Sequence, residues 1–317
     1  MSVTPVRVGI VGCGRLAERG YLPALSGLDA IRLVAVADPD GSRRAAVVAA
    51  AGPVATYGDA AELLDGTEVD GLLVASPVAR HVADATLAAE AGVVALVEKP
   101  PAADAATAAV LGALSPAPFL GFNRRFDGAA LAARSGVHPL GDVELDLALR
   151  YRRRRWAAHA VVDDAMLDLG PHLVDWARWI SGREVRSVAA EELSTDRAVL
   201  RLALAGGRAR LEAATNRPHE ERLRLRVDGR RVTDHRVGGA AAGLAARLPL
   251  RRSPDRLVGT LRAELAAFAH ALRTGCRGAL GTPADGVAVM AVLDAARASA
   301  ATGGRRIDVP TPDEVAP

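Results

Sequence analysis

The first third of the chain alternates short apolar runs with stretches of helical pattern. Runs of four to eight apolar residues are typical of buried strands, and the stretches between them have the length of helices. Strands separated in this way by helices predict a parallel sheet. We expect strands at 6–11, 31–37, 54–56, 71–75, 93–97 and from 119, and helices at 43–51, 59–64, after 77, and at 102–114.

The second half has a different pattern, in which apolar and polar residues alternate. A period of two predicts a mostly antiparallel sheet with one face covered. Because few helices remain to cover the other face, we expect an apolar patch there through which subunits pair. The expected strands are 142–150, 185–191, 198–203, 208–213, 222–227 and 306–309, the helices 167–180, 257–274 and 283–301, and a loop covers 239–254.

This change of pattern places a domain boundary between residues 121 and 122. We expect a dinucleotide-binding domain over 1–121 and a substrate-binding and oligomerisation domain over 122–317. At 317 residues the chain is long enough for two domains, each with its own core.

Composition narrows the class of protein. No apolar run reaches the roughly 20 residues that cross a bilayer, and no basic region with an apolar core precedes the first strand, so we expect neither a membrane partner nor a secretion signal. Cys13 and Cys276 make no disulfide framework, which favours a reducing, cytoplasmic location. The net charge is +3 with scattered arginines, so we expect no nucleic-acid partner.

A glycine-rich turn, Gly12-Cys13-Gly14-Arg15-Leu16-Ala17, follows the first strand. Its G-x-G-x-x-A form permits a tight turn and close approach of the backbone to a pyrophosphate at a helix N-terminus. Asp38 ends the second strand, where an acid binds ribose hydroxyls and disfavours a 2′-phosphate. NAD(H) is therefore favoured, while Arg43 and Arg44 leave NADP(H) possible. A helix N-cap or turn role is the alternative for Asp38.

Lys99 is the one lysine among 40 lysine and arginine residues, and it lies in Glu98-Lys99-Pro100 after a predicted strand. Lysine is a compact charge whose pKa moves on burial, unlike arginine, so we infer that this position needs an ammonium. Chance survival of a single lysine is the alternative. Gly12, Asp38 and Ser76 also follow strands. Ligands of parallel sheets bind outside the carboxyl ends of the strands, so these residues are expected at one edge.

Asp168, His172 and Asp175 are spaced to share one face of a helix. Two carboxylates beside a histidine orient the ring and bring its pKa near neutrality, where a general acid-base acts. Pro171 removes an N–H, so the helix is expected to begin or kink there. The alternatives are an N-cap for Asp168, a satisfied, partly buried ring for His172 and a surface acid for Asp175.

An arginine run, Tyr151-Arg152-Arg153-Arg154-Arg155-Trp156, ends a predicted strand. One or two of these arginines could bind a phosphate, such as that of a nucleotide-linked sugar. A solvated or subunit-contact role is equally open.

Together these motifs resemble the glucose-fructose oxidoreductase, inositol dehydrogenase and rhizopine-catabolism (Gfo/Idh/MocA) family. The resemblance rests on the glycine turn, on Ser76-Pro77 followed by His81, on Glu98-Lys99-Pro100, and on the runs 121–126, 168–175 and 298–303. It implies an α/β fold: an N-terminal Rossmann domain with a doubly wound parallel sheet, and a C-terminal α/β domain whose large, mostly antiparallel, open-faced sheet pairs subunits into a homodimer or homotetramer.

The resemblance also implies a site. Lys99, Asp168 and His172 would be the catalytic set, with no metal. Cofactor-binding residues would be Gly12, Gly14, Arg15, Leu16, Asp38, Arg43, Ser76, Pro77, His81, Glu98, Lys99 and Asn123. Substrate-binding residues would be Arg124, Arg125, Arg155, Trp156 and Asp175. Family members often have glycines shortly before the catalytic aspartate, where this chain has Asp163-Asp164.

The implied activity is that of an NAD(P)-dependent oxidoreductase. It would transfer a hydride between nicotinamide and a carbinol or keto carbon of a sugar, nucleotide sugar or cyclitol. Two alternatives stay open: a redox-neutral NAD-dependent glycosidase or epimerase of the same fold, and a non-catalytic dinucleotide-binding regulator.

Overall fold

The computed structural model describes residues 4–153, 164–238 and 256–315, which fall into two compact units. The first unit holds the described residues up to Phe126 together with 256–287, and the second holds those from Asp127 to 238 and from Ala288 to Val315. The division at residue 121 stays a prediction. The compact units differ from it because 122–126 and the helix α9 (Arg256–Thr274) belong with the first unit.

Six parallel strands form the sheet of the first unit, in the order β3-β2-β1-β4-β5-β6. β4 is buried at every position, as expected for a strand covered on both faces. The order reverses between β1 and β4, and a ligand crevice of a doubly wound sheet lies at such a reversal. The strands are β1 (Val6–Val11), β2 (Ile31–Ala37), β3 (Ala55–Tyr57), β4 (Gly71–Val74), β5 (Val94–Glu98) and β6 (Phe119–Gly121).

Helices connect these strands, and aspartates begin several of them. Asp40, Asp59 and Asp104 each accept backbone N–H groups of the first helical turn, which is the preferred N-cap arrangement. The helix expected at 102–114 is shorter, because Asp104 caps it at Ala105 and its end tightens into a 3₁₀ turn. The helical elements are η1 (Ala17–Tyr21), α1 (Leu22–Leu25), α2 (Gly41–Ala51), α3 (Ala60–Gly66), α4 (Val78–Glu90), α5 (Ala105–Ala109), η2 (Val110–Ala113) and η3 (Asn123–Phe126).

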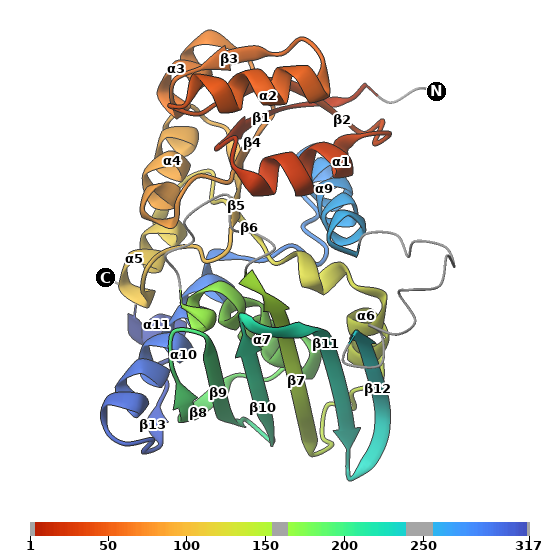
Figure 1. Ribbon diagram of the computed structural model, residues 1–317, viewed down its shortest axis with the longest axis vertical. Helices are drawn as coiled ribbons and strands as arrows, with labels where there is room; N and C mark the ends of the chain where they lie inside the picture. The colour runs from red at the N-terminus through yellow and green to blue at the C-terminus, as the bar shows by residue number, and fades with distance from the viewer. Residues whose placement is uncertain (1–3, 154–163, 239–255, 316–317) are drawn as a thin grey trace. The chain divides into compact units, whose positions relative to one another are not determined.

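The core of the first unit includes a helix from late in the sequence. Leu261, Leu265 and Phe268 of α9 are buried in one cluster with Val8 and Ile10 of β1. Burial of each such side chain contributes about 1.5–3 kcal/mol. Figure 1 shows α9 beside this sheet.

Seven strands form the sheet of the second unit, in the order β12-β11-β7-β10-β9-β8-β13. The β7–β10 pair is parallel and the other pairs are antiparallel, which confirms the expected mostly antiparallel sheet. β12 was not expected, because arginines and small polar residues replace a clear apolar face along it. The strands are β7 (Val143–Arg152), β8 (Val185–Leu193), β9 (Arg197–Leu204), β10 (Gly207–Ala214), β11 (Asn216–Val227), β12 (Arg230–Gly238) and β13 (Ile307–Asp308).

The long helix α7 (Ala165–Ser181) lies across one face of this sheet (Figure 1), where it contacts β7, β9 and β10. Leu145, Leu147 and Leu149 of β7 are buried on that side. Among the described residues, the helices α6 (Gly128–Ser135), α10 (Pro283–Ala301) and α11 (Pro312–Val315) also belong wholly or partly to this unit. The loop expected over 239–254 lies outside the described residues.

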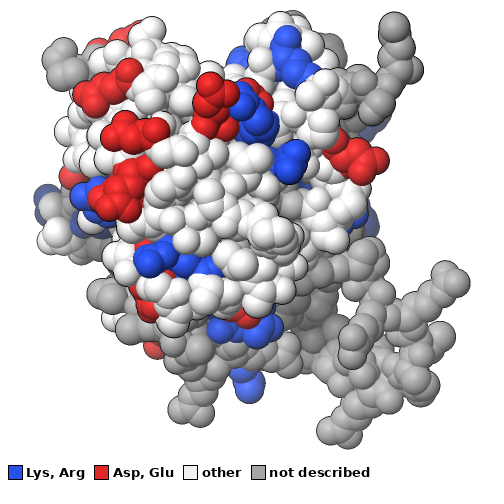
Figure 2. All heavy atoms as spheres, turned by 90° about the horizontal axis from the view of Figure 1, so that it is seen from above, with Lys and Arg blue, Asp and Glu red and all other residues white. Residues whose placement is uncertain are grey.

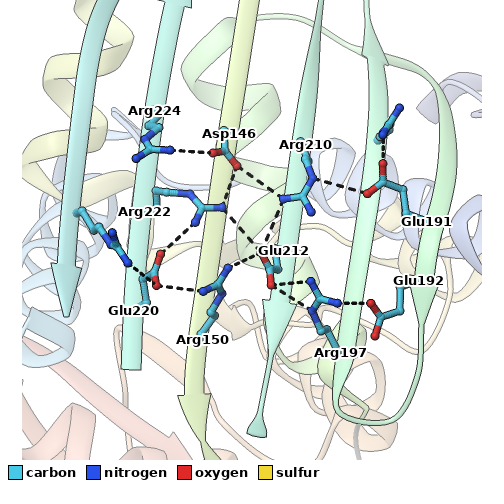
Figure 3. Close-up of polar contacts among 12 residues, drawn as sticks. Asp146, Arg150, Glu191, Glu192, Arg197, Arg210, Glu212, Glu220, Arg222 and Arg224 are labelled. Carbon is cyan, nitrogen blue, oxygen red and sulfur yellow. Dashed lines mark hydrogen bonds and ion pairs between the residues drawn. The ribbon is translucent and has the colours of Figure 1, made fainter. Parts of the chain in front are cut away.

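The opposite face of the sheet is charged, so the expected apolar patch is wrong. Figure 3 shows acidic and basic side chains alternating across neighbouring strands. Glu212, at the centre, lies within 3.1 Å of Arg197 and 3.8 Å of Arg222 and also pairs with Arg150. The apolar side chains of these strands face α7. Arginine, aspartate and glutamate side chains occupy positions on the opposite face.

Candidate active site

The glycine turn after β1 has a backbone conformation that only glycine fits at residue 12. Gly12 has a φ of +96°, and a Cβ there would lie 2.4 Å from the carbonyl oxygen of Ala75. At Gly14 a Cβ would meet nothing within 4 Å, so the space beside it is open. The turn therefore presents bare backbone, as close approach of a pyrophosphate requires.

Arg15 and Leu16 start the helical segment that follows this turn, where the Glu18 N–H bonds to the Gly14 carbonyl at 3.1 Å. Leu16 packs against the apolar core of the unit, so its contribution to a ligand site would be through its backbone.

Asp38 is held beside the glycine turn by main-chain donors. Its two carboxylate oxygens accept the N–H of Cys13 at 2.8 Å and of Asp40 at 2.9 Å, and it is 5% exposed. Asp40 caps α2, so the N-cap alternative for Asp38 is wrong, whereas the bond from the Asp40 N–H is a turn contact of the kind the other alternative named. Arg43 lies 3.9 Å from the Asp38 carboxylate, and Arg44 donates to the Asp38 carbonyl. A carboxylate fixed in this position fits the ribose of a dinucleotide bound at the turn.

His81 lies inside the first unit and contacts main chain with both ring nitrogens. Nε2 is 2.7 Å from the carbonyl oxygen of Ser76, and Nδ1 is 2.9 Å from that of Pro100. Burial lowers the pKa of His81, although Asp84 and the two carbonyls oppose this. With 2% exposure and both nitrogens engaged, the ring links two loops. We therefore revise its predicted role from cofactor contact to support.

Ser76 and Pro77 form the loop between β4 and α4. The Ser76 hydroxyl donates to Asp84 at 2.6 Å, and Arg80 lies 3.3 Å from the same carboxyl group. Pro77 precedes the first residue of α4. Contacts with α4 thus fix this loop at the carboxyl end of β4.

Glu98 ends β5 and is buried directly before Lys99. It accepts the Tyr21 hydroxyl at 2.7 Å and the Lys99 backbone N–H at 3.1 Å. Burial raises the pKa of Glu98 and of Tyr21. Lys99 itself is partly buried. Glu98 therefore fixes the backbone of Lys99 from the interior of the unit.

The segment after β6 is committed to packing. Asn123 donates to Thr260 Oγ1 of α9 at 3.1 Å. Arg125 is 3% exposed in its side chain, pairs with Asp285 at 3.1 Å and lies over the Phe122 ring. Arg125 therefore leaves the set of substrate candidates, whereas the partly buried Arg124 stays in it.

In the second unit, α7 is one helix from Ala165 to Ser181 and passes through Pro171. It begins at Asp164, whose carboxylate accepts the Leu167 N–H at 2.7 Å, so the expected start at Pro171 and the N-cap alternative for Asp168 are both wrong. Asp168 lies in the first turn, where the helix dipole favours a negative charge.

His172 lies one turn beyond Asp168 and is 9% exposed. Asp175 is completely buried within the unit, so its alternative as a surface acid is wrong. Because Asp175 is buried, it is a weaker candidate for direct substrate contact than Asp168 and His172.

Two residues that sequence reasoning had not assigned to catalysis reach Asp168. The Tyr151 hydroxyl donates to Asp168 Oδ2, and Arg153 Nη2 lies 3.9 Å from the same oxygen. Tyr151 continues the inward positions of β7, so the period of two could have placed it against α7. Arg155, Trp156 and Asp163 lie outside the described residues.

The structure thus assembles two groups, each within its own unit. The first unit brings Gly12, Gly14, Asp38, Ser76 and Lys99 to the carboxyl edge of its parallel sheet. The second unit joins Asp168 and His172 with Tyr151 and Arg153.

In the described ranges no helix is long and apolar enough to cross a bilayer. On the face seen from above, acidic and basic side chains are scattered among uncharged residues (Figure 2).

A parallel sheet of this order, with an open glycine turn and a fixed acid after its second strand, defines a dinucleotide-binding oxidoreductase domain. Two family models agree. Residues 6–115 match the oxidoreductase family with an NAD-binding Rossmann fold, and residues 144–233 match the GFO/IDH/MocA C-terminal domain. The chain belongs to the GFO/IDH/MocA oxidoreductase family. This confirms the resemblance, the fold class and the expectation of a nicotinamide dinucleotide cofactor.

Curated relatives are similar over part of their length. Inositol 2-dehydrogenase 1 of Saccharopolyspora erythraea is 33% identical over 62% of this chain and 61% of its own. Rhizopine catabolism protein MocA of Rhizobium meliloti is 30% identical over 57% of this chain and 59% of its own. The matches thus span about three-fifths of these relatives.

Solved structures share the fold over nearly the whole chain. The scyllo-inositol dehydrogenase of Lactobacillus casei with bound NAD(H) and scyllo-inositol has a TM-score of 0.78 at 19% identity, covering 96% of this chain and 99% of its own. At this identity the likeness establishes the architecture.

Proposed function

We propose that the chain is an NAD(P)-dependent dehydrogenase or ketoreductase acting on a carbinol or keto carbon of a cyclitol or sugar. The observation that carries this proposal is the Asp168–His172 pair on the first turns of α7. An acid one helical turn from a histidine supplies a general acid-base in an oxidoreductase family whose relatives include inositol dehydrogenases.

His172 exchanges the proton of the substrate hydroxyl in this proposal, and Asp168 orients its ring and stabilises its charged form. Lys99 binds the reacting oxygen and stabilises the charge that develops there. The bound dinucleotide supplies the hydride donor or acceptor. The chain therefore provides the proton path, the oxyanion contact and the alignment.

NAD(H) is the preferred cofactor in this proposal. The Asp38 carboxylate is buried and fixed, so a 2′-phosphate would meet an anion that cannot move away. Arg43 is a cation beside this carboxylate, and its charge is partly balanced by Asp38 itself and by Asp40.

We propose a homo-oligomer, a dimer or tetramer, that forms through the charged face of the second sheet. Ion pairs of both signs spread over several strands there, including Arg150–Glu220 at 3.0 Å and Arg224–Asp234 at 3.0 Å (Figure 3). A surface with both signs in alternation can be complementary to a second copy of itself.

Activity is tested by adding inositols, free sugars and nucleotide sugars to the protein with NAD⁺ or NADP⁺ and following the absorbance of the reduced cofactor. We expect turnover with a cyclitol or sugar, and a loss of orders of magnitude in kcat for His172→Ala and Lys99→Ala while dinucleotide binding stays intact. His270→Ala, an exposed histidine of α9, is the matched control. Near-native turnover in both variants would contradict the catalytic assignment.

The same assay separates the alternatives. A redox-neutral glycosidase or epimerase would convert substrate without net release of reduced cofactor. A non-catalytic regulator would bind the dinucleotide and convert nothing.

A further inference from the structure

The Asp168 carboxylate is contacted by two side chains from the end of β7. Tyr151 donates its hydroxyl to Oδ2, and the Arg153 guanidinium lies 3.9 Å from that atom. The Arg153 backbone N–H is fixed in turn on the Thr215 carbonyl at 2.8 Å. These contacts lie within one unit and come from a strand and a helix that pack directly on each other.

We propose that Tyr151 is a positioning residue that fixes Asp168 and, through it, sets how strongly His172 holds its proton, with Arg153 as the accompanying cation. The catalytic meaning of this proposal rests on the proposed role of His172 as acid-base. All four residues lie in the second unit, so the proposed electrostatic link can be tested without a substrate.

Packing alone does not account for a tyrosine at this position. Residue 151 continues the inward series of Leu145, Leu147 and Leu149, where an apolar side chain would satisfy the interior. A phenolic hydroxyl in such a place needs a hydrogen-bond partner, and Asp168 is that partner. Burial and the negative charge of Asp168 both raise the pKa of Tyr151, so its hydroxyl stays protonated and remains a donor.

The sign of the effect follows from charge. A hydrogen bond and a nearby cation stabilise the Asp168 carboxylate and reduce its pull on a proton at His172. Without the Tyr151 hydroxyl, the carboxylate attracts an imidazolium more strongly, so the pKa of His172 rises. With the hydroxyl in place, His172 is more often neutral and ready to accept a substrate proton.

Other charged groups near this site stay unchanged in a Tyr151 variant. On α7 these are Asp164, which caps the helix, and the buried Asp175. On β11, beside β7, His219 and Glu221 approach each other at 4.0 Å. Glu212 of β10, the strand on the other side of β7, is engaged in the ion pairs of the opposite face. A shift measured in the variant is therefore attributable to the Tyr151 hydroxyl.

The experiment is a nuclear magnetic resonance titration of the full chain with isotope-labelled histidine, in which His172→Asn assigns the His172 signal. We expect Tyr151→Phe to raise the pKa of His172 by about half a unit, a roughly threefold change in its protonation equilibrium. Arg153→Gln should shift it in the same direction, and serves as the second variant if Tyr151→Phe does not fold. Tyr57→Phe, which removes a hydroxyl bonded to Thr67 in the first unit, should leave it unchanged.

An unchanged His172 pKa in folded Tyr151→Phe and Arg153→Gln would overturn the proposal, even if turnover fell. Where a substrate is turned over, the acid limb of the kcat/KM profile of Tyr151→Phe should move to higher pH by the same amount. A wild-type protein that converts no polyol would refute the proposed function, while the titration would still decide the link between Tyr151 and His172.

Discussion

The imidazole Nδ1 of His81 lies 2.9 Å from the carbonyl oxygen of Pro100, and its Nε2 lies 2.7 Å from that of Ser76. One buried ring thus joins the loop after β4 to the residue that follows Lys99. We expect His81→Phe, which keeps an aromatic ring, to leave one buried carbonyl without its hydrogen-bond donor, since the neutral imidazole carries a single N–H, and to destabilise the fold by about 1–3 kcal/mol. Urea unfolding measures the loss.

The control for that variant is His270→Phe, because His270 is exposed on α9. Lys99 sits next to the disturbed loop, so any residual folded His81→Phe protein should also bind substrate more weakly. Equal midpoints of unfolding for the two variants would show that the ring does not link these loops.

The same histidine predicts a pH dependence of stability. Burial lowers the pKa of His81 below its ordinary 6.5, so the unfolded chain binds the proton more readily than the folded one. The free energy of unfolding therefore has its full value above pH 6.5 and falls as the pH drops below it. The wild type should lose stability over this window by more than His81→Phe does. Parallel curves for the two proteins would contradict the assignment.

Asp38 predicts the cofactor preference. Asp38→Asn keeps the side-chain shape and removes the charge beside Arg43 and Arg44. We expect the ratio of NADP⁺ to NAD⁺ affinity to rise by about tenfold, or about 1.4 kcal/mol, because the repulsion of a 2′-phosphate is lost while the arginines remain. Titration of tryptophan fluorescence with both dinucleotides gives the ratio. Asp59→Asn, at the N-cap of α3, should leave it unchanged, and the same ratio in both variants would rule out Asp38 as the discriminator.

The elements of the first unit were predictable because local pattern and fold agree there. Gly12, Asp38 and Lys99 each follow a strand that is apolar for several residues, so chain order alone places them at one sheet edge. α9 was recognisable as a helix at 257–274, but not as part of this unit. Its apolar residues fit either core, and only the packing of Phe268 and Leu265 against β1 decides between them.

The candidate site was predictable where the spacing on a helix carries the information, as for Asp168 and His172. It was not predictable where the contact crosses between elements. Tyr151 meets Asp168 because β7 and α7 pack together, and His81 meets Pro100 because α4 packs beside β5 and the loop that follows it. The expected start at Pro171 was wrong because Asp164 caps the helix earlier in the chain, while the expected kink at Pro171 stays a prediction.

The last prediction concerns the charged face of the second sheet. The alternation of apolar and polar residues in the sequence had indicated an apolar surface there. Arg222 lies 3.0 Å from both Asp146 and Glu220, and Arg224 lies 3.6 Å from Asp146. If copies of the chain associate through this face, charge complementarity contributes to the contact and salt screens its exposed part. We expect sedimentation equilibrium to show an oligomer at low salt that weakens at high salt, and Arg224→Glu to weaken it further at low salt. Arg32→Glu, at an exposed position of β2 in the first unit, is the control. An oligomer that tightens with salt, as burial of apolar surface would make it, places the contact elsewhere on the molecule.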